Sequence, residues 1–215
     1  MKKIILIGDS IRMGYDKYVK EAFEGSAEVY YHNENTRFSA YALRFLHDWI
    51  NKSSFPADAD LIHWNVGLWD VVRVYGEEPL TSIEEYKRNL AALYRRFKLH
   101  FPGAVQIFAT STSSVEEKYG ANFKRYNKDI EEYNKAAIEV LAPLGVKIND
   151  LYPYTLTLGE DCRGGDPTHY NTPAGVKAMG DRVVSVISAE LGIKAEEINI
   201  ENFKPHDYTA ENIGR

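Results

Sequence analysis

The sequence is poor in three features that each mark a class of protein: cysteine, long apolar runs and an excess of positive charge. Cys162 is the only cysteine, so an internal disulfide is excluded. No apolar run approaches the roughly 18 residues of a membrane-spanning helix. The run at residues 4–7 is also shorter than the about 7–15 apolar residues of a secretory signal. We therefore expect a cytoplasmic protein that does not insert into a membrane.

The charge balance is slightly acidic, with 26 Lys and Arg against 31 Asp and Glu in 215 residues and a net charge of −5. Affinity for phosphate backbones comes from clustered cations, so this balance argues against a nucleic-acid partner. Hydrophobic residues make up 44% of the chain and charged residues 27%, which is typical of a folded globular domain. No set of His, Asp and Glu residues has the spacing of a metal site, so we expect no metal ligand.

Short apolar runs alternate with stretches of helical periodicity along most of the chain. Strands are predicted at residues 4–7, 27–31, 61–64, 105–109 and 146–148, and helices at 41–49, 82–101, 130–141 and 172–191. Strands that alternate with helices form βαβ units. The sequence therefore predicts an α/β fold: a three-layer α/β/α sandwich with a mostly parallel five-stranded sheet. We expect one domain over residues 1–193 and a tail, residues 194–215, that packs on the same domain.

Two polar motifs lie where an active site forms in such folds, next to the carboxyl ends of the strands. Gly8-Asp9-Ser10 directly follows the first predicted strand, where a serine hydroxyl can leave the sheet beside a helix N-terminus. Asp166 precedes His169 by three residues, just before the last predicted helix, so its carboxylate can orient the imidazole. Taken singly, Ser10 is also explained as a helix cap and His169 as a surface histidine.

Taken together, the two motifs resemble those of the SGNH (GDSL-type) hydrolases, and the resemblance covers the chain from residue 4 to about residue 191. It implies a flavodoxin-like sandwich, with Ser10 as nucleophile, His169 as general base and Asp166 as its orienting carboxylate. The mechanism so implied requires neither a metal nor an organic cofactor. The segments 33–43, 64–70, 125–127 and 148–152 resemble one branch of these hydrolases, whose members are commonly assigned as acylhydrolases or carbohydrate esterases.

The oxyanion-binding residues of that family are altered in this sequence. The family's second block supplies a glycine N–H, but residues 33–39 contain no glycine. Its third block is G-x-N-D, whereas Gly67 is followed by Trp69 at the asparagine position. We expect the oxyanion to be bound by the Ser10 N–H, by a donor at Thr36 or the side chain of Asn35, and by the side chain of Asn65. Gly67 and Trp69 complete the predicted oxyanion and substrate-binding set.

Aromatic residues suggest the substrate, because flat rings with a polar rim suit sugars and long acyl chains need an aliphatic groove. The chain has fifteen tyrosines. Rings predicted near strand ends are Trp69, Tyr75, Tyr119, Tyr154 and Tyr170. The leading hypothesis is a serine esterase for short-acyl esters, with a small-molecule substrate such as an O-acetylated oligosaccharide. Two alternatives stay open: a lipid acylhydrolase of the lysophospholipase or thioesterase type, and a catalytically impaired glycan-binding module.

Overall fold

Five parallel strands form the central sheet in the computed structural model, which describes residues 1–204. The strands are β1 (Lys2–Ile7), β2 (Ala27–Tyr31), β3 (Leu61–Trp64), β5 (Val105–Ala109) and β7 (Lys147–Asn149). Their order across the sheet is β2-β1-β3-β5-β7, and every neighbouring pair is parallel. This arrangement confirms the predicted three-layer α/β fold.

The central strands are mostly apolar because helices cover both faces of the sheet; the exceptions in β1 and β3 are Lys2, Lys3 and His63. The residues from Ile4 to Ile7 in β1 are each at most 3% exposed, and all four residues of β3 are buried. Strands buried on both sides read as continuous apolar runs and not as alternating ones. Four of the five predicted strands therefore match closely, while β7 lies one residue later than predicted.

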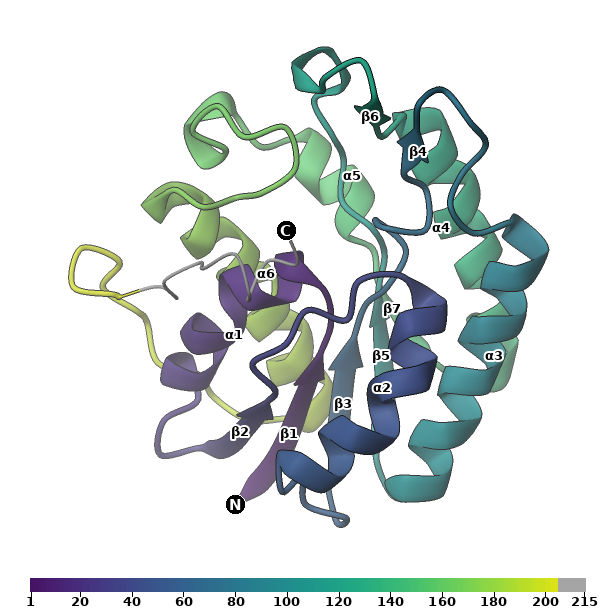
Figure 1. The fold of residues 1–215 in the computed structure, drawn as a ribbon. Helices are drawn as coiled ribbons and strands as arrows, with labels where there is room; N and C mark the ends of the chain where they lie inside the picture. Colours follow the sequence, from purple (N-terminus) through teal and green to yellow (C-terminus); the bar gives the residue numbers. More distant parts are fainter. Residues whose placement is uncertain (205–215) are drawn as a thin grey trace.

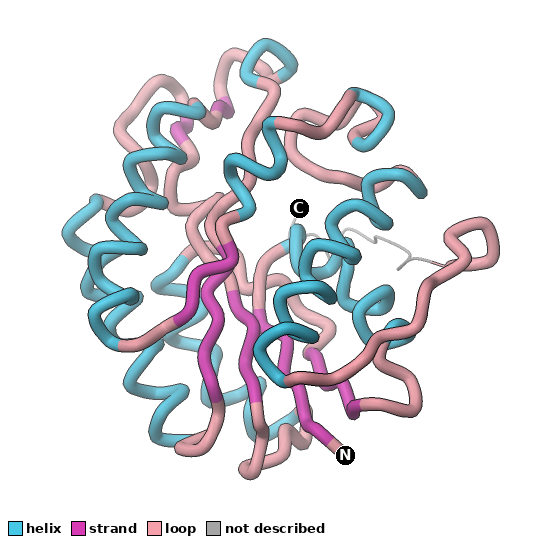
Figure 2. Tube along the Cα trace, turned by 180° about the vertical axis from the view of Figure 1, so that it is seen from behind, coloured by secondary structure: helices cyan, strands magenta, loops and turns pink. Residues whose placement is uncertain are grey.

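The helices form two groups, one on each side of the sheet (Figures 1 and 2). The long helices are α1 (Ser10–Ala22), α2 (Ser39–Lys52), α3 (Ile83–His100), α4 (Asn127–Leu141) and α6 (Pro173–Leu191). α1 packs against α6, whereas α2, α3 and α4 pack in series. The first and last helices of the chain are thus neighbours, and this places the two predicted motifs in one region.

Helices α3 and α6 begin within one residue of the predicted start, because their capping residues directly precede them. The Ser82 side chain accepts a hydrogen bond from the Glu85 N–H at the start of α3. Thr172 caps α6 ahead of Pro173, and Gly192 ends that helix with a φ of 64°. α2 is longer than the predicted 41–49, and α4 starts three residues before the predicted residue 130.

Several short elements above the sheet were not predicted. β4 (Arg73–Val74) and β6 (Phe123–Lys124) form an antiparallel pair between the loops that follow β3 and β5. A 3₁₀ helix (Glu116–Lys118) precedes β6 in the same connection, while α5 (Leu151–Leu156) and two further 3₁₀ helices (Ala142–Leu144 and Glu160–Cys162) lie in later connections. These elements have two to six residues, too few for hydrophobic periodicity to reveal them.

The chain beyond α6 runs over the outer side of α1. The Glu196 N–H donates to the Ala22 carbonyl oxygen at 2.7 Å, and Ile198 is buried at 6% exposure. The Phe203 ring makes an edge contact with Tyr18, with the ring centroids 5.5 Å apart. Residues 205–215 of the predicted tail lie outside the described part of the chain. Within residues 1–204 no helix is both long and apolar enough to cross a membrane.

Candidate active site

Ser10 lies at the start of α1, directly after β1. Asp9 is the N-cap, and its Oδ1 accepts the Ile11 N–H at 2.9 Å. Gly8 is required at this turn, since a Cβ there would lie 1.9 Å from Asn65 Oδ1 and 2.7 Å from Arg12 Cβ. The backbone N–H of Ser10 belongs to the first turn of the helix, where amides have no intrahelical acceptor and attract negative charge.

A hydrogen-bonded chain connects Ser10 to the second motif. His169 Nε2 lies 2.8 Å from Ser10 Oγ, and His169 Nδ1 lies 3.1 Å from Asp166 Oδ2. The other carboxylate oxygen, Asp166 Oδ1, accepts the backbone N–H groups of Thr168 at 2.7 Å and His169 at 2.8 Å. Asp166 therefore fixes both the backbone and the ring of the histidine, and the imidazole faces the serine hydroxyl.

The environment of Asp166 keeps its carboxylate ionised. Burial raises its pKa, but the hydrogen bonds from the ring and backbone of His169 and the backbone of Thr168 outweigh burial and lower the pKa to about 2. An ionised carboxylate accepts the Nδ1 proton and so leaves Nε2 available as a base toward Ser10. The three side chains have the geometry of a nucleophile, base and orienting acid.

The loop of residues 33–37, predicted to supply an oxyanion donor, lies beside the nucleophile turn but uses its polar groups internally. The Thr36 N–H donates to the Gly8 carbonyl oxygen at 3.2 Å, and Asn35 Oδ1 accepts the Arg37 N–H at 2.8 Å. Arg37 has a positive φ of 51°. The Thr36 N–H is thus bonded to the nucleophile turn and does not face an incoming carbonyl. The buried Thr36 hydroxyl has no hydrogen-bond partner among the described residues.

Arg12 joins this loop to the nucleophile turn. Its Nη2 donates to the carbonyl oxygens of Gly8 at 3.2 Å and Glu34 at 2.6 Å, and its Nη1 donates to Asp16 Oδ2 at 2.5 Å. Both side chains of the Arg12–Asp16 pair are fully buried. The pair is spaced i, i+4 on α1, but the sequence does not distinguish it from an exposed helical ion pair.

Asn65 is next to the nucleophile turn, as expected. Its Nδ2 donates to Asp9 Oδ1 at 2.8 Å, and an amide nitrogen carries a second hydrogen for a further acceptor. Burial raises the pKa of Asp9, an effect that the hydrogen bonds from Asn65 and the Ile11 N–H oppose. Asn65 Oδ1 and Asp9 Oδ2 are buried and have no partner within residues 1–204.

Gly67 and Trp69 have structural surroundings that differ from each other. Gly67 has a φ of 138°, and a Cβ there would lie 2.6 Å from Ser111 Oγ and 2.7 Å from Tyr86 Oη, so only glycine fits. The Trp69 ring packs edge-on against Phe123, with the ring centroids 6.2 Å apart. Trp69 has no amide in its side chain, so it does not replace the family's asparagine.

Asp70, the last residue of the altered third block, caps a helix from a distance. Its carboxylate accepts the Ser39 N–H and, at 2.6 Å, the Ser39 hydroxyl. Phe38, the N-cap of α2, offers no side-chain acceptor, so Asp70 takes that role. Burial raises the pKa of Asp70 to about 6. This long-range cap explains why α2 begins before the predicted residue 41.

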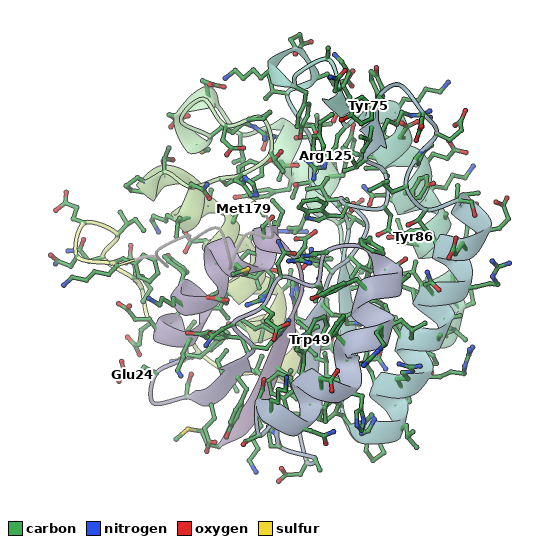
Figure 3. The ribbon with its side chains drawn as sticks, in the orientation of Figure 1. Glu24, Trp49, Tyr75, Tyr86, Arg125 and Met179 are labelled. Carbon is green, nitrogen blue, oxygen red and sulfur yellow. The ribbon has the colours of Figure 1, made fainter. Side chains whose placement is uncertain are left out.

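The predicted aromatic residues do not form one group. Trp69 and Tyr119 both lie against the Arg125 guanidinium, while Tyr75 is 74% exposed in the segment after β4. Tyr154 donates to the Ala178 carbonyl oxygen, and Tyr170 is 4% exposed beside Arg163. Figure 3 places Arg125 and Tyr75 on the side of the molecule that lies beyond the carboxyl ends of the strands. Sequence reasoning noted Arg125 only in a family segment and did not place it at the site.

No group of three or more His, Cys, Asp or Glu side chains within residues 1–204 is arranged to hold a metal ion. His63 lies in the sheet, where burial lowers its pKa to about 3 and its Nε2 lies 3.1 Å from Asn149 Nδ2. Cys162 is buried. Neither side chain joins the Ser10 cluster.

No family model matches the sequence, and no curated protein matches it. Solved structures do share its fold. A lipase/acylhydrolase from Enterococcus faecalis has a TM-score of 0.68 at 19% identity, with 92% of this chain and 100% of that chain covered. The acetyl xylan esterase AlAXEase has a TM-score of 0.64 at 17% identity, over 86% and 99% of the two chains. The psychrotrophic esterase EstA from Pseudoalteromonas sp. has a TM-score of 0.67 at 11% identity, over 89% and 100%.

These likenesses establish a shared fold. The expected resemblance to the SGNH (GDSL-type) hydrolases is confirmed at the level of architecture. The roles of individual side chains follow from their own geometry in this chain.

Proposed function

We propose that this chain, which has the fold of the SGNH (GDSL-type) hydrolases, is a serine ester hydrolase that acts on short-acyl esters. The observation that carries the proposal is the hydrogen-bonded chain from Ser10 through His169 to Asp166. Ser10 and His169 are 159 residues apart in sequence, yet their side chains are in hydrogen-bond contact. Shared folds with esterases and acylhydrolases support the same reaction class.

In the proposed mechanism, His169 Nε2 removes the Ser10 hydroxyl proton as Ser10 Oγ attacks the ester carbonyl carbon. The oxyanion that forms is bound by the Ser10 N–H and by the second amide hydrogen of Asn65. His169 then returns the proton to the leaving alcohol, and an acyl group remains on Ser10. Water, deprotonated by His169, then attacks the acyl carbonyl carbon, and the bond to Ser10 Oγ breaks. His169 returns the proton to Ser10 Oγ, and the carboxylic acid leaves. Every step uses side chains and amides of the chain itself.

The space beside the nucleophile supports a short acyl group. A hollow of about 10 Å³ lies next to the Ser10–His169 pair, against α1 and α6. Such a volume holds at most about one water molecule. Its other lining residues are Ile11, Gly14, Tyr170, Asn171 and Met179. A long acyl chain does not fit a hollow of this size, and this supports a short acyl group.

The carbohydrate part of the proposal rests on the rings near the site and on a structural neighbour. Trp69, Tyr119 and Phe123 gather around Arg125, and flat rings of this kind stack on sugar faces. One protein with the same fold is an acetyl xylan esterase. We propose an O-acetylated carbohydrate as substrate on this basis.

The second candidate is a lipid acylhydrolase, which the fold shared with a lipase/acylhydrolase favours. The two candidates predict opposite trends with acyl length. The internal hydrogen bonds of loop 33–37 favour a third candidate, an impaired module that binds glycans without turnover.

A series of p-nitrophenyl esters from acetate to octanoate, given to the parent protein and to Ser10→Ala at neutral pH, separates the three. Serine-dependent turnover that falls with acyl length supports the proposal. Turnover that rises with length supports the lipid acylhydrolase. Glycan binding without serine-dependent turnover of any ester supports the impaired module and overturns the proposal.

A further inference from the structure

Arg125 is a buried cation whose guanidinium has one nitrogen without a hydrogen-bond acceptor among the described residues. The residue is 5% exposed and directly follows β6. Its Nε donates to the Leu68 carbonyl oxygen at 2.7 Å, and its Nη1 lies 3.3 Å from Thr168 Oγ1 and 3.4 Å from Tyr119 Oη. Its Nη2 has no acceptor among residues 1–204. Two of its three nitrogens thus fix the guanidinium, and the third is available.

Within residues 1–204 no acid balances the charge of Arg125. No carboxylate within the described residues forms an ion pair with it, whereas Arg12 pairs with Asp16 and Arg73 pairs with Asp129. Removal of a guanidinium from water is costly unless a counter-charge compensates it. Arg163, also buried without a carboxylate, differs because its Nη2 is bonded to both oxygens of Ser113.

Aromatic rings hold the Arg125 guanidinium in place. Its Cζ lies 5.2 Å from the ring centre of Trp69, 5.7 Å from that of Tyr119 and 5.1 Å from that of Phe123. Cation–π contacts compensate part of the lost hydration, and the rings lower the local dielectric. A negative group that reaches Nη2 there is bound more strongly than one at an exposed arginine.

The position of Arg125 relates it to the ester-cleaving residues. Leu68, whose carbonyl it binds, lies in the loop between Asn65 and Asp70, and Thr168 is the residue before His169. The positive charge is also near enough to lower the pKa of Asp9, the neighbour of the nucleophile. Figure 3 shows Arg125 between the strand ends and the segment that carries Tyr75. A substrate held at Ser10 therefore has part of its structure within the field of Arg125.

We propose that the ester substrate carries a carboxylate and that Arg125 binds it through Nη2. This inference rests on the proposed ester hydrolysis and specifies its substrate class. A carboxylate has the single negative charge that one unpaired guanidinium balances, and charge-assisted hydrogen bonds are the stronger ones. The carboxylate belongs either to the acyl part, as in a half-ester of a dicarboxylic acid, or to the alcohol part, as in an acetylated uronic acid.

Matched substrate pairs test the inference. For the acyl side the pair is p-nitrophenyl butyrate and mono-p-nitrophenyl succinate; for the alcohol side it is the acetates of methyl glucoside and methyl glucuronoside. In at least one pair we expect the parent to favour the anionic member by about 10-fold or more in kcat/KM. In Arg125→Gln that ratio should fall by about 10- to 100-fold, and Arg125→Lys should restore part of it. The pair that shows the preference assigns the carboxylate to its side.

Arg73→Gln is the matched control, since Arg73 lies in β4, the strand that pairs with β6 just before Arg125, but has acidic partners in Asp129 and Glu78. It should leave the anionic-to-neutral ratio unchanged. Equal kcat/KM for both members of both pairs in the parent overturns the inference. An unchanged ratio in a folded Arg125→Gln protein, checked by circular dichroism, overturns it as well.

Binding to the Ser10→Ala protein gives a readout without turnover. Calorimetry at low salt should show succinate or glucuronate binding at least 10-fold more tightly than glucose, with the difference lost in Ser10→Ala/Arg125→Gln. Absence of that difference overturns the inference. Absence of serine-dependent turnover on every ester overturns the proposed function instead, so the two failures are distinguishable.

Discussion

The nucleophile side of the site, made by Ser10, His169 and Asp166, and the oxyanion side, made by residues 33–37 and 65–70, differ in where their hydrogen bonds go. On the nucleophile side the side chains bond to one another in a line that ends at the serine hydroxyl. On the oxyanion side the polar groups bond mostly to backbone and to other buried groups of the fold.

The nucleophile side is therefore constrained mainly by its chemistry, and the oxyanion side by the packing of the fold as well. The nucleophile side depends on three side chains, Ser10, His169 and Asp166, which come from two short motifs. The oxyanion side also connects parts of the fold, because Asp70 caps α2 and Arg12 bonds to both loop 33–37 and Gly8. Substitutions on the first side should reduce catalysis more than stability, and those on the second should reduce both.

Ser10→Ala should give the largest effect, a loss of about 10⁶-fold in kcat, as expected when the nucleophile of such a triad is removed. The melting temperature should stay near that of the parent, because the substitution removes one hydroxyl and its single hydrogen bond to His169. Kinetics on p-nitrophenyl acetate together with thermal unfolding measure both quantities. A kcat within 10-fold of the parent would show that Ser10 is not the nucleophile.

Asp166→Asn should lower kcat by about 10⁴-fold, because the amide no longer fixes the tautomer of His169. The same change removes an ionised carboxylate whose pKa is about 2 in the folded protein. In the parent this group stabilises the fold at pH values above its unfolded pKa, and the stabilisation is lost as pH falls through about 2. The variant lacks this contribution. Kinetics at neutral pH and urea unfolding at pH 2 and 7 measure the two effects. Retention of more than a tenth of the parent's kcat would contradict the orienting role.

Arg12→Met tests the buried ion pair of Arg12 with Asp16, next to the contact between loop 33–37 and Gly8. Removal of one partner from a buried ion pair leaves a buried charge and should cost about 3–5 kcal/mol in the free energy of unfolding. Arg44→Met is the matched control, since Arg44 and Asp48 form an exposed pair of the same spacing, which should contribute about 0–1 kcal/mol. Urea unfolding measures both variants. Equal losses in the two would mean that burial of the Arg12 pair has no energetic role.

Asn65→Ala sharpens the comparison within the oxyanion side. If the second amide hydrogen meets the oxyanion, kcat should fall by about 10²–10³-fold, in the range known for one lost donor. Asn35→Ala should have a smaller effect, because the Asn35 side-chain oxygen is bonded to the Arg37 N–H. Steady-state kinetics on both variants decide the point. A larger kcat loss in Asn35→Ala would transfer the donor role to loop 33–37.

The smallest effect concerns pH. The pKa of Asp70 is about 6 in the folded protein, above its ordinary value of 3.8, so between these values the folded state binds more protons than the unfolded state. Stability from this group therefore falls as pH rises from about 4 to 6. The melting temperature of the parent minus that of Asp70→Asn should decrease across this window, by a few degrees. A difference that stays flat or rises would contradict the assigned pKa shift.

The sheet and the nucleophile line could be predicted because their signals are local. Residues 4–7 are a continuous apolar run and residues 61–64 are apolar except for His63, while Ser10, Asp166 and His169 belong to short motifs with a chemical meaning. The oxyanion side could not be predicted in the same way. Whether the Thr36 N–H meets Gly8 or a substrate depends on tertiary packing, and no periodicity encodes it.

The position of Arg125 was likewise out of reach of the sequence. β4 and β6 are two residues each and pair across nearly fifty residues of chain, so no local pattern predicts the pairing. The start of α2 was misjudged for a similar reason, since its cap is Asp70, 31 residues further along.

The distance between Ser10 and His169 along the chain has a consequence for synthesis on the ribosome. The nucleophile emerges early, in the first turn of α1, while its base and orienting acid follow only in the segment before α6. A chain that stops before residue 166 thus has its nucleophile without a partner. On the proposed mechanism, activity therefore appears only after the ribosome has translated past β7. Two separately made fragments, divided between β7 and Asp166, would generate activity only on reassociation.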